Sequence, residues 1–158
     1  MTRVRIDAAD PAEPDARALI AELAAELTRV TGHFTATSYA PEDAHTPRSL
    51  FVIARDPADD RALGCGAIRA LPGGPEGVAE LKRMYARPGT HGVGHAILTH
   101  LEDAARTFGY TELWLETGVE NERGLRFYER HGYATIPNFG PYVGHPEATC
   151  RGKRLADA

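Results

Sequence analysis

Three β-like runs that follow one another closely constrain the fold more than any other feature of the sequence. They are 49–55 (SLFVIAR), 63–71 (LGCGAIRAL) and 78–86 (VAELKRMYA), and the turn-forming segments DPADDR and PGGPEG separate them. Short turns between strands predict an antiparallel meander, because neighbouring strands joined in this way run in opposite directions. Helical patterns before and after the meander exclude an all-β fold.

The segments before the meander predict one strand and one long helix. Thr2–Ile6 alternates polar and apolar residues, which is typical of a strand, and a Pro-rich turn follows it. A helix is then predicted that ends at Gly32, because five apolar residues fall at helical spacing on one face: Leu19, Ile20, Leu23, Leu27 and Val30. We expect 33–47 to be a loop with one helical turn at 41–44.

The second half of the chain alternates helices and strands. A helix is predicted over 95–108 with its end at Gly109, a buried strand over 112–117, and a second helix over 121–131 that Asn121 caps. Two last strands, 133–136 and 148–153, enclose a Pro/Gly-rich loop. This order predicts one α+β domain over residues 1–158, with a mixed sheet flanked by helices.

Composition narrows the class of protein. The chain has 158 residues, 42% of them hydrophobic, and a net charge of −4, which suits an ordinary globular domain. Its 18 basic residues are scattered and form no stripe, so we expect no nucleic-acid partner. No apolar run is long enough to span a membrane, the first residues form no signal core, and the two cysteines lack metal-like spacing. We therefore expect a cytoplasmic protein with reduced, buried thiols.

A glycine turn, Gly92-Val93-Gly94, lies between the third meander strand and the helix that follows it. Glycines let the backbone approach a ligand closely, and the first turn of a helix attracts anions, so the turn is suited to a phosphate group. The alternative is that the glycines only shape a tight turn. Two phosphate motifs are excluded: no Gly-Lys-Ser/Thr follows, and Ile97 stands where a dinucleotide fingerprint has its third glycine.

Two segments resemble the GCN5-related N-acetyltransferase (GNAT) family. NERGLRFYERHGY, residues 121–133, is similar to that family's N-x-x-A-x-x-x-Y-x-x-x-G-F segment: Asn121, Tyr128 and Gly132 match, while Gly124 replaces the alanine and Tyr133 the phenylalanine. Upstream, ELKRMYARP…GVGHAILTHLEDAARTFGY resembles the acetyl-CoA segment, and LWLETG the strand after it. The resemblance covers roughly residues 49–136.

The resemblance implies both a fold and an activity. The fold is a mostly antiparallel sheet that splays into a V. The activity is acetyl transfer from acetyl-CoA, as co-substrate, to a primary amine of a small molecule or peptide, with no metal. One part departs from the family: Arg/Gln-x-x-Gly-x-Gly/Ala would place the Arg or Gln at Gly89, or the turn is two residues shorter with His91 near that place.

The family's pyrophosphate is held by backbone N–H groups, which the resemblance assigns here to Gly92, Val93, Gly94 and His95. We expect acetyl-CoA to bind more weakly without the usual cation, with Arg87 or His91 offsetting part of the loss. An alternative is an acyl-CoA-binding module that kept the fold and lost efficient turnover.

The same resemblance assigns further parts of the cofactor site. It places the pantetheine arm against the backbone of Met84, Tyr85 and Ala86. Tyr128 becomes the general acid that protonates the leaving thiolate, unless it only packs the helix against the sheet. Asn121 caps its helix and contacts the cofactor.

Glu80 is the candidate general base, because histone-type family members carry a glutamate on this strand; alternation also allows it to face solvent. Glu116 is the second candidate, or else the partner of a Lys or Arg.

The resemblance implies an acceptor site at 33–48 and 137–145, with Tyr39, Glu42 and Asp43 in the first segment and Phe139 and Tyr142 in the second. Together with Glu116, these aromatic and acidic groups suit a cationic amine. The alternative is that both segments are solvated loops.

The remaining histidines carry no metal prediction. His91 and His95 are four residues apart, but the glycines between them oppose a helical pair, and no third ligand is near in sequence. His100 and His131 are interpreted as exposed helix residues. A homodimer is compatible with a sheet of this size.

Overall fold

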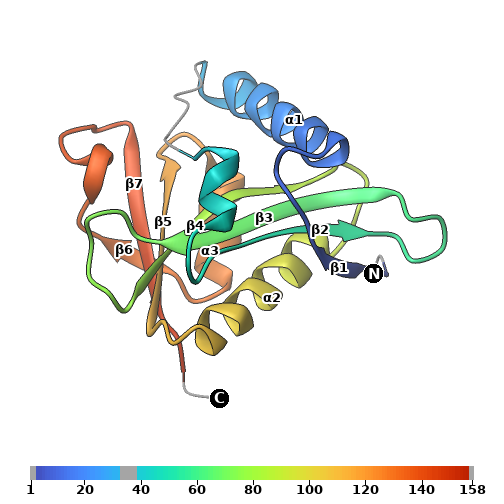
Figure 1. Ribbon diagram of the computed structural model, residues 1–158. Coiled ribbons are helices and arrows are strands. Elements are labelled where there is room, and N and C mark those ends of the chain that lie inside the picture. Colours follow the sequence, from blue (N-terminus) through green and yellow to red (C-terminus); the bar gives the residue numbers. More distant parts are fainter. Residues whose placement is uncertain (1–2, 33–38, 157–158) are drawn as a thin grey trace.

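The computed structural model describes residues 3–32 and 39–156, and one seven-stranded sheet runs through this part of the chain (Figure 1). The strands lie in the order β1-β2-β3-β4-β5-β7-β6. In chain order the elements are β1 (Arg5–Ala8), α1 (Pro14–Thr31), the 3-10 helix η1 (Pro41–His45), β2 (Leu50–Arg55), β3 (Ala62–Ala70), β4 (Val78–Ala86), α2 (Val93–Thr107), β5 (Glu112–Gly118), α3 (Glu122–Arg130), β6 (Ala134–Ile136), the 3-10 helix η2 (Gly140–Tyr142) and β7 (Ala148–Arg154).

All neighbouring strands pair in antiparallel fashion except β4 and β5, which are parallel. A parallel pair needs a crossover connection, and α2 is that connection. The predicted mixed, mostly antiparallel sheet is therefore confirmed.

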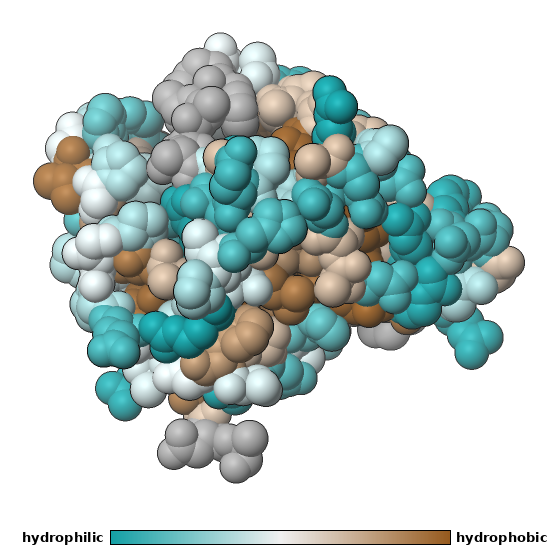
Figure 2. Space-filling model, viewed as in Figure 1, coloured by the Kyte–Doolittle hydropathy of each residue, from teal (hydrophilic) through white to brown (hydrophobic). Residues whose placement is uncertain are grey.

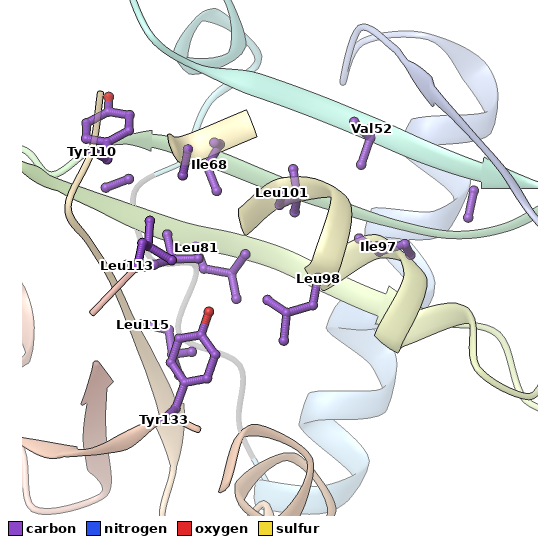
Figure 3. Packing of buried hydrophobic residues seen from close by; sticks show 14 of the residues in the cluster. Val52, Ile68, Leu81, Ile97, Leu98, Leu101, Tyr110, Leu113, Leu115 and Tyr133 are labelled. Atoms are coloured by element: carbon purple, nitrogen blue, oxygen red, sulfur yellow. The ribbon is translucent and has the colours of Figure 1, made fainter. Parts of the chain in front are cut away.

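Helices cover both faces of the sheet (Figure 1). On one face α1 packs against β2 and β3 through Leu19, Phe51 and Ile53. On the other face α2 packs against the sheet, where Ile97, Leu98 and Leu101 meet Val52, Ile68, Leu81, Leu113 and Leu115 (Figure 3). Phe51 and Ile53 alternate along β2 with Val52, so β2 is buried on both faces, which explains its continuous apolar run.

The predicted elements agree with the structure except at some of their ends. The meander and the helical turn near Pro41 are confirmed. The first strand is Arg5–Ala8 rather than 2–6, because its length is set by pairing with β2, from Arg5 opposite Arg55 to Ala8 opposite Val52. Helix α2 begins two residues earlier than predicted, at Val93, because Gly92 adopts the left-handed conformation (φ 78°) at its N-cap.

The face shown in Figure 2 is mostly hydrophilic, and the turn between β2 and β3 (56–61) projects at the right edge of this view. Val119 and Val143 are the large apolar side chains most exposed among the described residues, at 45% and 65%. Within residues 3–32 and 39–156, none of the helices has the length and apolar character needed to cross a membrane.

Candidate active-site cleft

A cleft of about 1180 Å³ opens where β4 and β5 part. The two strands are paired only from Val78 opposite Glu112 to Glu80 opposite Trp114. Beyond this point β4 keeps β3 on one side, and β5 keeps β7 on the other. The cleft lies between the separated ends, with the C-terminal half of α1, the start of α2 and one side of α3 around it. The predicted splay of the sheet is confirmed.

A bulge shapes the β4 wall of the cleft. The β3–β4 register shifts between Cys65 and Ala67, so that two residues of β4 oppose one of β3, and Arg83 there has a φ of 58°. The thiol of Cys65 donates a hydrogen bond to the Arg83 carbonyl at 3.2 Å and fixes the bulge. Met84, Tyr85 and Ala86 follow and line the cleft, as expected for the segment assigned to the pantetheine arm.

The glycine turn leads directly into the cleft. Gly92, Val93, Gly94 and His95 all line it, and the last three form the first turn of α2, whose N–H groups have no partner within the helix. A Cβ atom on Gly94 would lie 3.2 Å and 3.3 Å from two ring carbons of Phe127. Glycine at this position therefore lets α3 approach the turn closely.

Arg87 does not supply the missing cation, contrary to expectation. Its Nε and Nη2 donate to the Glu22 carboxylate on α1 at 3.0 Å and 2.7 Å, and its Nη1 donates to the Ala62 carbonyl at 2.8 Å. These bonds hold the guanidinium against α1 and β3, and Arg87 is absent from the lining of the cleft. His91, the other expected cation, does line it.

Asn121 caps α3, as predicted, and also faces the cleft. Its Oδ1 accepts from the Gly124 N–H and its Nδ2 donates to the Thr117 hydroxyl, both at 3.1 Å. A Cβ atom on Gly124 would lie 2.6 Å from Asn121 Nδ2, which explains the glycine at this position. Tyr133 also has a partner of its own, since its hydroxyl donates to the buried Glu102 carboxylate at 2.7 Å.

Tyr128 and Glu116 line the cleft from α3 and β5. Burial raises the pKa of Tyr128, and the Glu116 charge raises it further, so the phenol keeps its proton at neutral pH. Burial also raises the pKa of Glu116; Glu80 and Glu147 add to this, whereas Lys82 acts against it. The two groups are therefore a hydroxyl donor and a carboxylate with increased proton affinity in the same cleft.

Glu80 lies elsewhere, and its burial corrects one of the two expectations for it, the solvent-facing one. Only 3% of its surface is exposed, so it is not a solvent-facing residue, and it is not among the residues that line the cleft. Arg69 donates to one oxygen of Glu80 at 2.9 Å and pairs with Asp43 at 3.0 Å. Lys82 Nζ is 3.7 Å from the second oxygen of Glu80. Glu80 thus belongs to a buried ionic network between β3, β4 and η1.

The expected acceptor residues separate into two groups. Tyr142 lines the cleft, and its hydroxyl accepts a hydrogen bond from Lys82 Nζ at 3.1 Å. Phe139 does not line it: its ring packs against Trp114 and Tyr142, with both centroids at 5.4 Å.

The segment 33–48 contributes less to the cleft than expected. Its residues 33–38 lie outside the described part of the chain. Tyr39, Glu42 and Asp43 are described and are not part of the lining. The guanidinium carbons of Arg69 and Arg83 lie 5.6 Å and 5.5 Å from the centroid of the Tyr39 ring.

Sequence reasoning did not assign several polar residues that line the cleft, among them Lys82, Arg83 and His131. The sequence did contain a signal for Lys82, because strand alternation places it on the same face as Glu80, which was itself a candidate site residue. Burial lowers the pKa of Lys82, and the Arg69 and Arg83 charges act in the same direction against the Glu80 charge. His131 is the C-cap of α3 and is only partly exposed, so its interpretation as an exposed helix residue is wrong. It also contacts His95. In residues 3–32 and 39–156, no three His, Cys, Asp or Glu side chains gather as a metal site would require.

Comparisons with known proteins agree with this geometry. The family model for the acetyltransferase (GNAT) family matches residues 17–133. An IAA acetyltransferase of Azospirillum brasilense is 35% identical over 133 residues, which are 80% of this chain and 84% of that protein. The crystal structure of a Klebsiella pneumoniae protein assigned as an acyl-CoA N-acyltransferase is 30% identical, with a TM-score of 0.79 over 97% of this chain and 98% of that one.

A more distant structure shows the fold alone. The N-acetylglutamate synthase of Neisseria gonorrhoeae, complexed with coenzyme A and N-acetylglutamate, is 22% identical, with a TM-score of 0.70. The match covers 99% of this chain and 36% of that one.

Proposed function

This chain belongs to the acetyltransferase (GNAT) family, and we propose that it transfers the acetyl group of acetyl-CoA to a primary amine of a small molecule or peptide. One observation carries the proposal: the cleft between β4 and β5 brings a backbone edge, a phenol and a carboxylate together. The structure of the Neisseria synthase contains coenzyme A and includes the same fold, which supports the choice of cofactor.

The cofactor would lie across the cleft, from the glycine turn to the bulge of β4. The first-turn N–H groups of Val93, Gly94 and His95 suit its pyrophosphate, because a helix N-terminus attracts anions. The backbone of Met84–Ala86 faces the cleft on the side where β4 has lost its partner strand, and it suits the amides of the pantetheine arm. Asn121 would contact the cofactor at the start of α3.

The chemistry is a direct attack. The amine nitrogen forms a bond with the acetyl carbonyl carbon, and the carbon–sulfur bond breaks. Tyr128 would donate its proton to the leaving thiolate, and Glu116 would accept the proton that the amine loses. The raised pKa of Glu116 makes it a stronger base than an exposed carboxylate. Burial raises the pKa of the Cys65 thiol to about 12 and also raises that of Cys150, which supports a mechanism without a cysteine acyl intermediate.

The acceptor amine would reach the carbonyl from the side of Tyr142 and Glu116. Glu116 gives this end of the cleft a carboxylate, and Tyr142 gives it an aromatic face. We propose Glu116 as the base in place of Glu80, because the Glu80 carboxylate is bound by Arg69 away from the cleft. Phe139 would support Tyr142 from behind, through ring contact.

Two substitutions test these roles once an amine panel has identified an acceptor. Tyr128→Phe and Glu116→Gln are each expected to lower kcat by about 10²–10⁴-fold, the usual contribution of a positioned acid or base. Both variants should bind acetyl-CoA within about twofold of wild type, as measured by calorimetry, because neither side chain is assigned to the pyrophosphate or pantetheine. Glu112→Gln is the matched control, since Glu112 lies on the same face of β5 outside the cleft.

The pH profile separates a base from a residue that only shapes the cleft. A base must be ionised, so the wild-type rate should fall as the pH falls through the raised pKa of Glu116. Glu116→Gln should lose this acidic limb, and Glu112→Gln should keep it. Unchanged rates in Glu116→Gln would contradict the assignment.

The second candidate function, an acyl-CoA-binding module without efficient turnover, is favoured by one observation: Arg87 pairs with Glu22 instead of facing the cleft. Tight binding of acetyl-CoA by the wild type, with no amine in the panel acetylated, would support it. Absence of acetyl-CoA binding would contradict both candidates.

A further inference from the structure

A hydrogen-bonded pair of histidines lies at the end of the cleft that carries the glycine turn. His95 is in the first turn of α2 and His131 directly follows α3, and both line the cleft. Nδ1 of His95 is 2.9 Å from Nε2 of His131, and Nδ1 of His131 is 2.7 Å from the Phe127 carbonyl oxygen. The three groups form a chain that ends at Nε2 of His95.

The acceptor at the start of this chain fixes where the protons are. A carbonyl oxygen only accepts, so Nδ1 of His131 must carry a hydrogen. In the neutral pair, Nε2 of His131 then accepts the hydrogen of His95 Nδ1, and Nε2 of His95 is left with a lone pair. A lone pair repels an anion.

One additional proton reverses this property. If His95 holds it, both nitrogens of that ring are donors. If His131 holds it, His131 donates to Nδ1 of His95, whose hydrogen moves to Nε2. In both cases Nε2 of His95 carries a hydrogen, and the pair carries one positive charge. The two rings share the charge across a single hydrogen bond.

We propose that the pair takes up one proton when acetyl-CoA binds and so supplies the cation that the glycine turn lacks. This inference rests on the proposed function. His95 directly follows Gly94, so its ring stands beside the N–H groups assigned to the pyrophosphate. Arg87 cannot supply this cation, because the Glu22 carboxylate on α1 holds its guanidinium group.

Charged groups of both signs line the same cleft as the pair, among them Glu26, Arg29, Glu120, Glu122 and Arg123. His91 stands on the turn before α2, and Arg130 precedes His131 on α3; both line the cleft. The positive end of the α2 dipole also disfavours a charge on His95, whereas the C-terminal end of α3 favours one on His131. The described residues place no carboxylate in an ion pair with either ring; the histidine ion pairs there are those of His45 and His145. A phosphate bound at the glycine turn would place a negative charge next to His95.

Calorimetry measures this proton directly. Acetyl-CoA is titrated at about pH 8, where free imidazoles are mostly neutral, in two phosphate-free buffers that differ in their heat of ionisation. The difference in binding heat gives the number of protons taken up. Wild type should take up close to one proton. Dephospho-CoA, which lacks the 3′-phosphate, should give the same uptake, because the pyrophosphate is the proposed partner; an absence of uptake with it would overturn the inference.

Three variants complete the test. His95→Gln should bind about tenfold more weakly, the usual effect of losing one charge-assisted hydrogen bond, and should take up no proton. His95→Arg should bind at least as tightly as wild type and also take up none, because its charge is permanent. His100→Gln is the control, since His100 is an exposed residue of α2 outside the cleft, and it should behave as wild type.

Wild-type binding without proton uptake would overturn the inference and leave the proposed function intact. Equal uptake in His95→Gln would overturn it as well. Failure of the wild type to bind acetyl-CoA would instead contradict the proposed function itself.

Discussion

Replacement of Gly66 by alanine should measure how closely α2 must lie on the sheet. Gly64 and Gly66 lie two residues apart on β3 and face α2, so the helix rests against bare backbone. A Cβ atom on Gly66 would lie 2.7 Å from Met84 Sδ, 2.8 Å from Ile97 Cγ2 and 3.0 Å from Leu101 Cδ1. Unstrained carbon contacts are about 3.5–4.0 Å long, so these atoms must move by about 0.5–1 Å.

The three neighbours differ in how easily they move. Met84 is unbranched and flexible, and its thioether can swing aside. Ile97 and Leu101 are fully buried, and Ile97 is β-branched and has one preferred rotamer in a helix, so α2 itself must shift. Overpacking of this kind costs about 1–3 kcal/mol, and each kcal/mol lowers the Tm of a chain of this size by about 2–4 °C.

Thermal unfolding followed by circular dichroism checks this value, with Gly118→Ala as the matched control. Gly118 also lies in a strand, but its Cβ would come no closer than 3.4 Å to Thr31 Cγ2, which is ordinary contact. A Gly66→Ala protein that melts within about 1 °C of wild type would refute the packing argument. Gly64→Ala should lower the Tm more than Gly66→Ala does, because a Cβ atom on Gly64 would meet the backbone carbonyl of Tyr85. A shift of that part of β4 should also weaken acetyl-CoA binding.

Two further predictions concern ion pairs. Arg69→Met should destabilise the protein by about 3–5 kcal/mol in denaturant unfolding, because it leaves Glu80 buried without its main partner. Adding Glu80→Met should recover most of this loss of stability. Full stability in Arg69→Met alone would argue against the network. The hydrogen bonds from Arg87 lower the pKa of Glu22, so this pair stabilises the fold above the unfolded-state pKa and the contribution is lost as the pH falls through the folded-state pKa. Glu22→Gln should lack that acid-side loss in unfolding curves taken between about pH 6 and pH 3, and an unchanged pH dependence would count against the pair.

The order and type of the elements could be predicted because each is specified locally. Apolar periodicity defines α1 and the meander, and Asn121 marks the start of α3 through a cap that the structure contains. The exact ends of the helices and strands were harder to predict. The start of α2 depends on the left-handed φ of Gly92, and the extent of β1 depends on its partner strand β2.

The candidate site likewise has one part that the sequence could predict and one part that it could not. The glycine turn, Tyr128 and Asn121 all line the cleft, because two motifs place them on elements that meet there. The surroundings of Glu80 could not be predicted, for a physical reason. Alternation says that Glu80 and Lys82 share a strand face, but the Arg69 that binds Glu80 lies on the neighbouring strand, eleven residues away in sequence. No local pattern reports such a partner.

The same reason explains why the positive charge of the glycine turn could not be assigned from sequence. Arg87 is near the turn in the chain, yet the acid that binds it lies 65 residues away on α1. His131 is 36 residues from His95 and contacts it only because α3 packs across Gly94 through Phe127. A cation in a binding site is thus defined less by its neighbours in sequence than by which carboxylates the fold brings to it. By this criterion Arg87 is not the cation of the glycine turn, because Glu22 binds it. The inferred cation is the histidine pair, whose charge depends on the bound ligand.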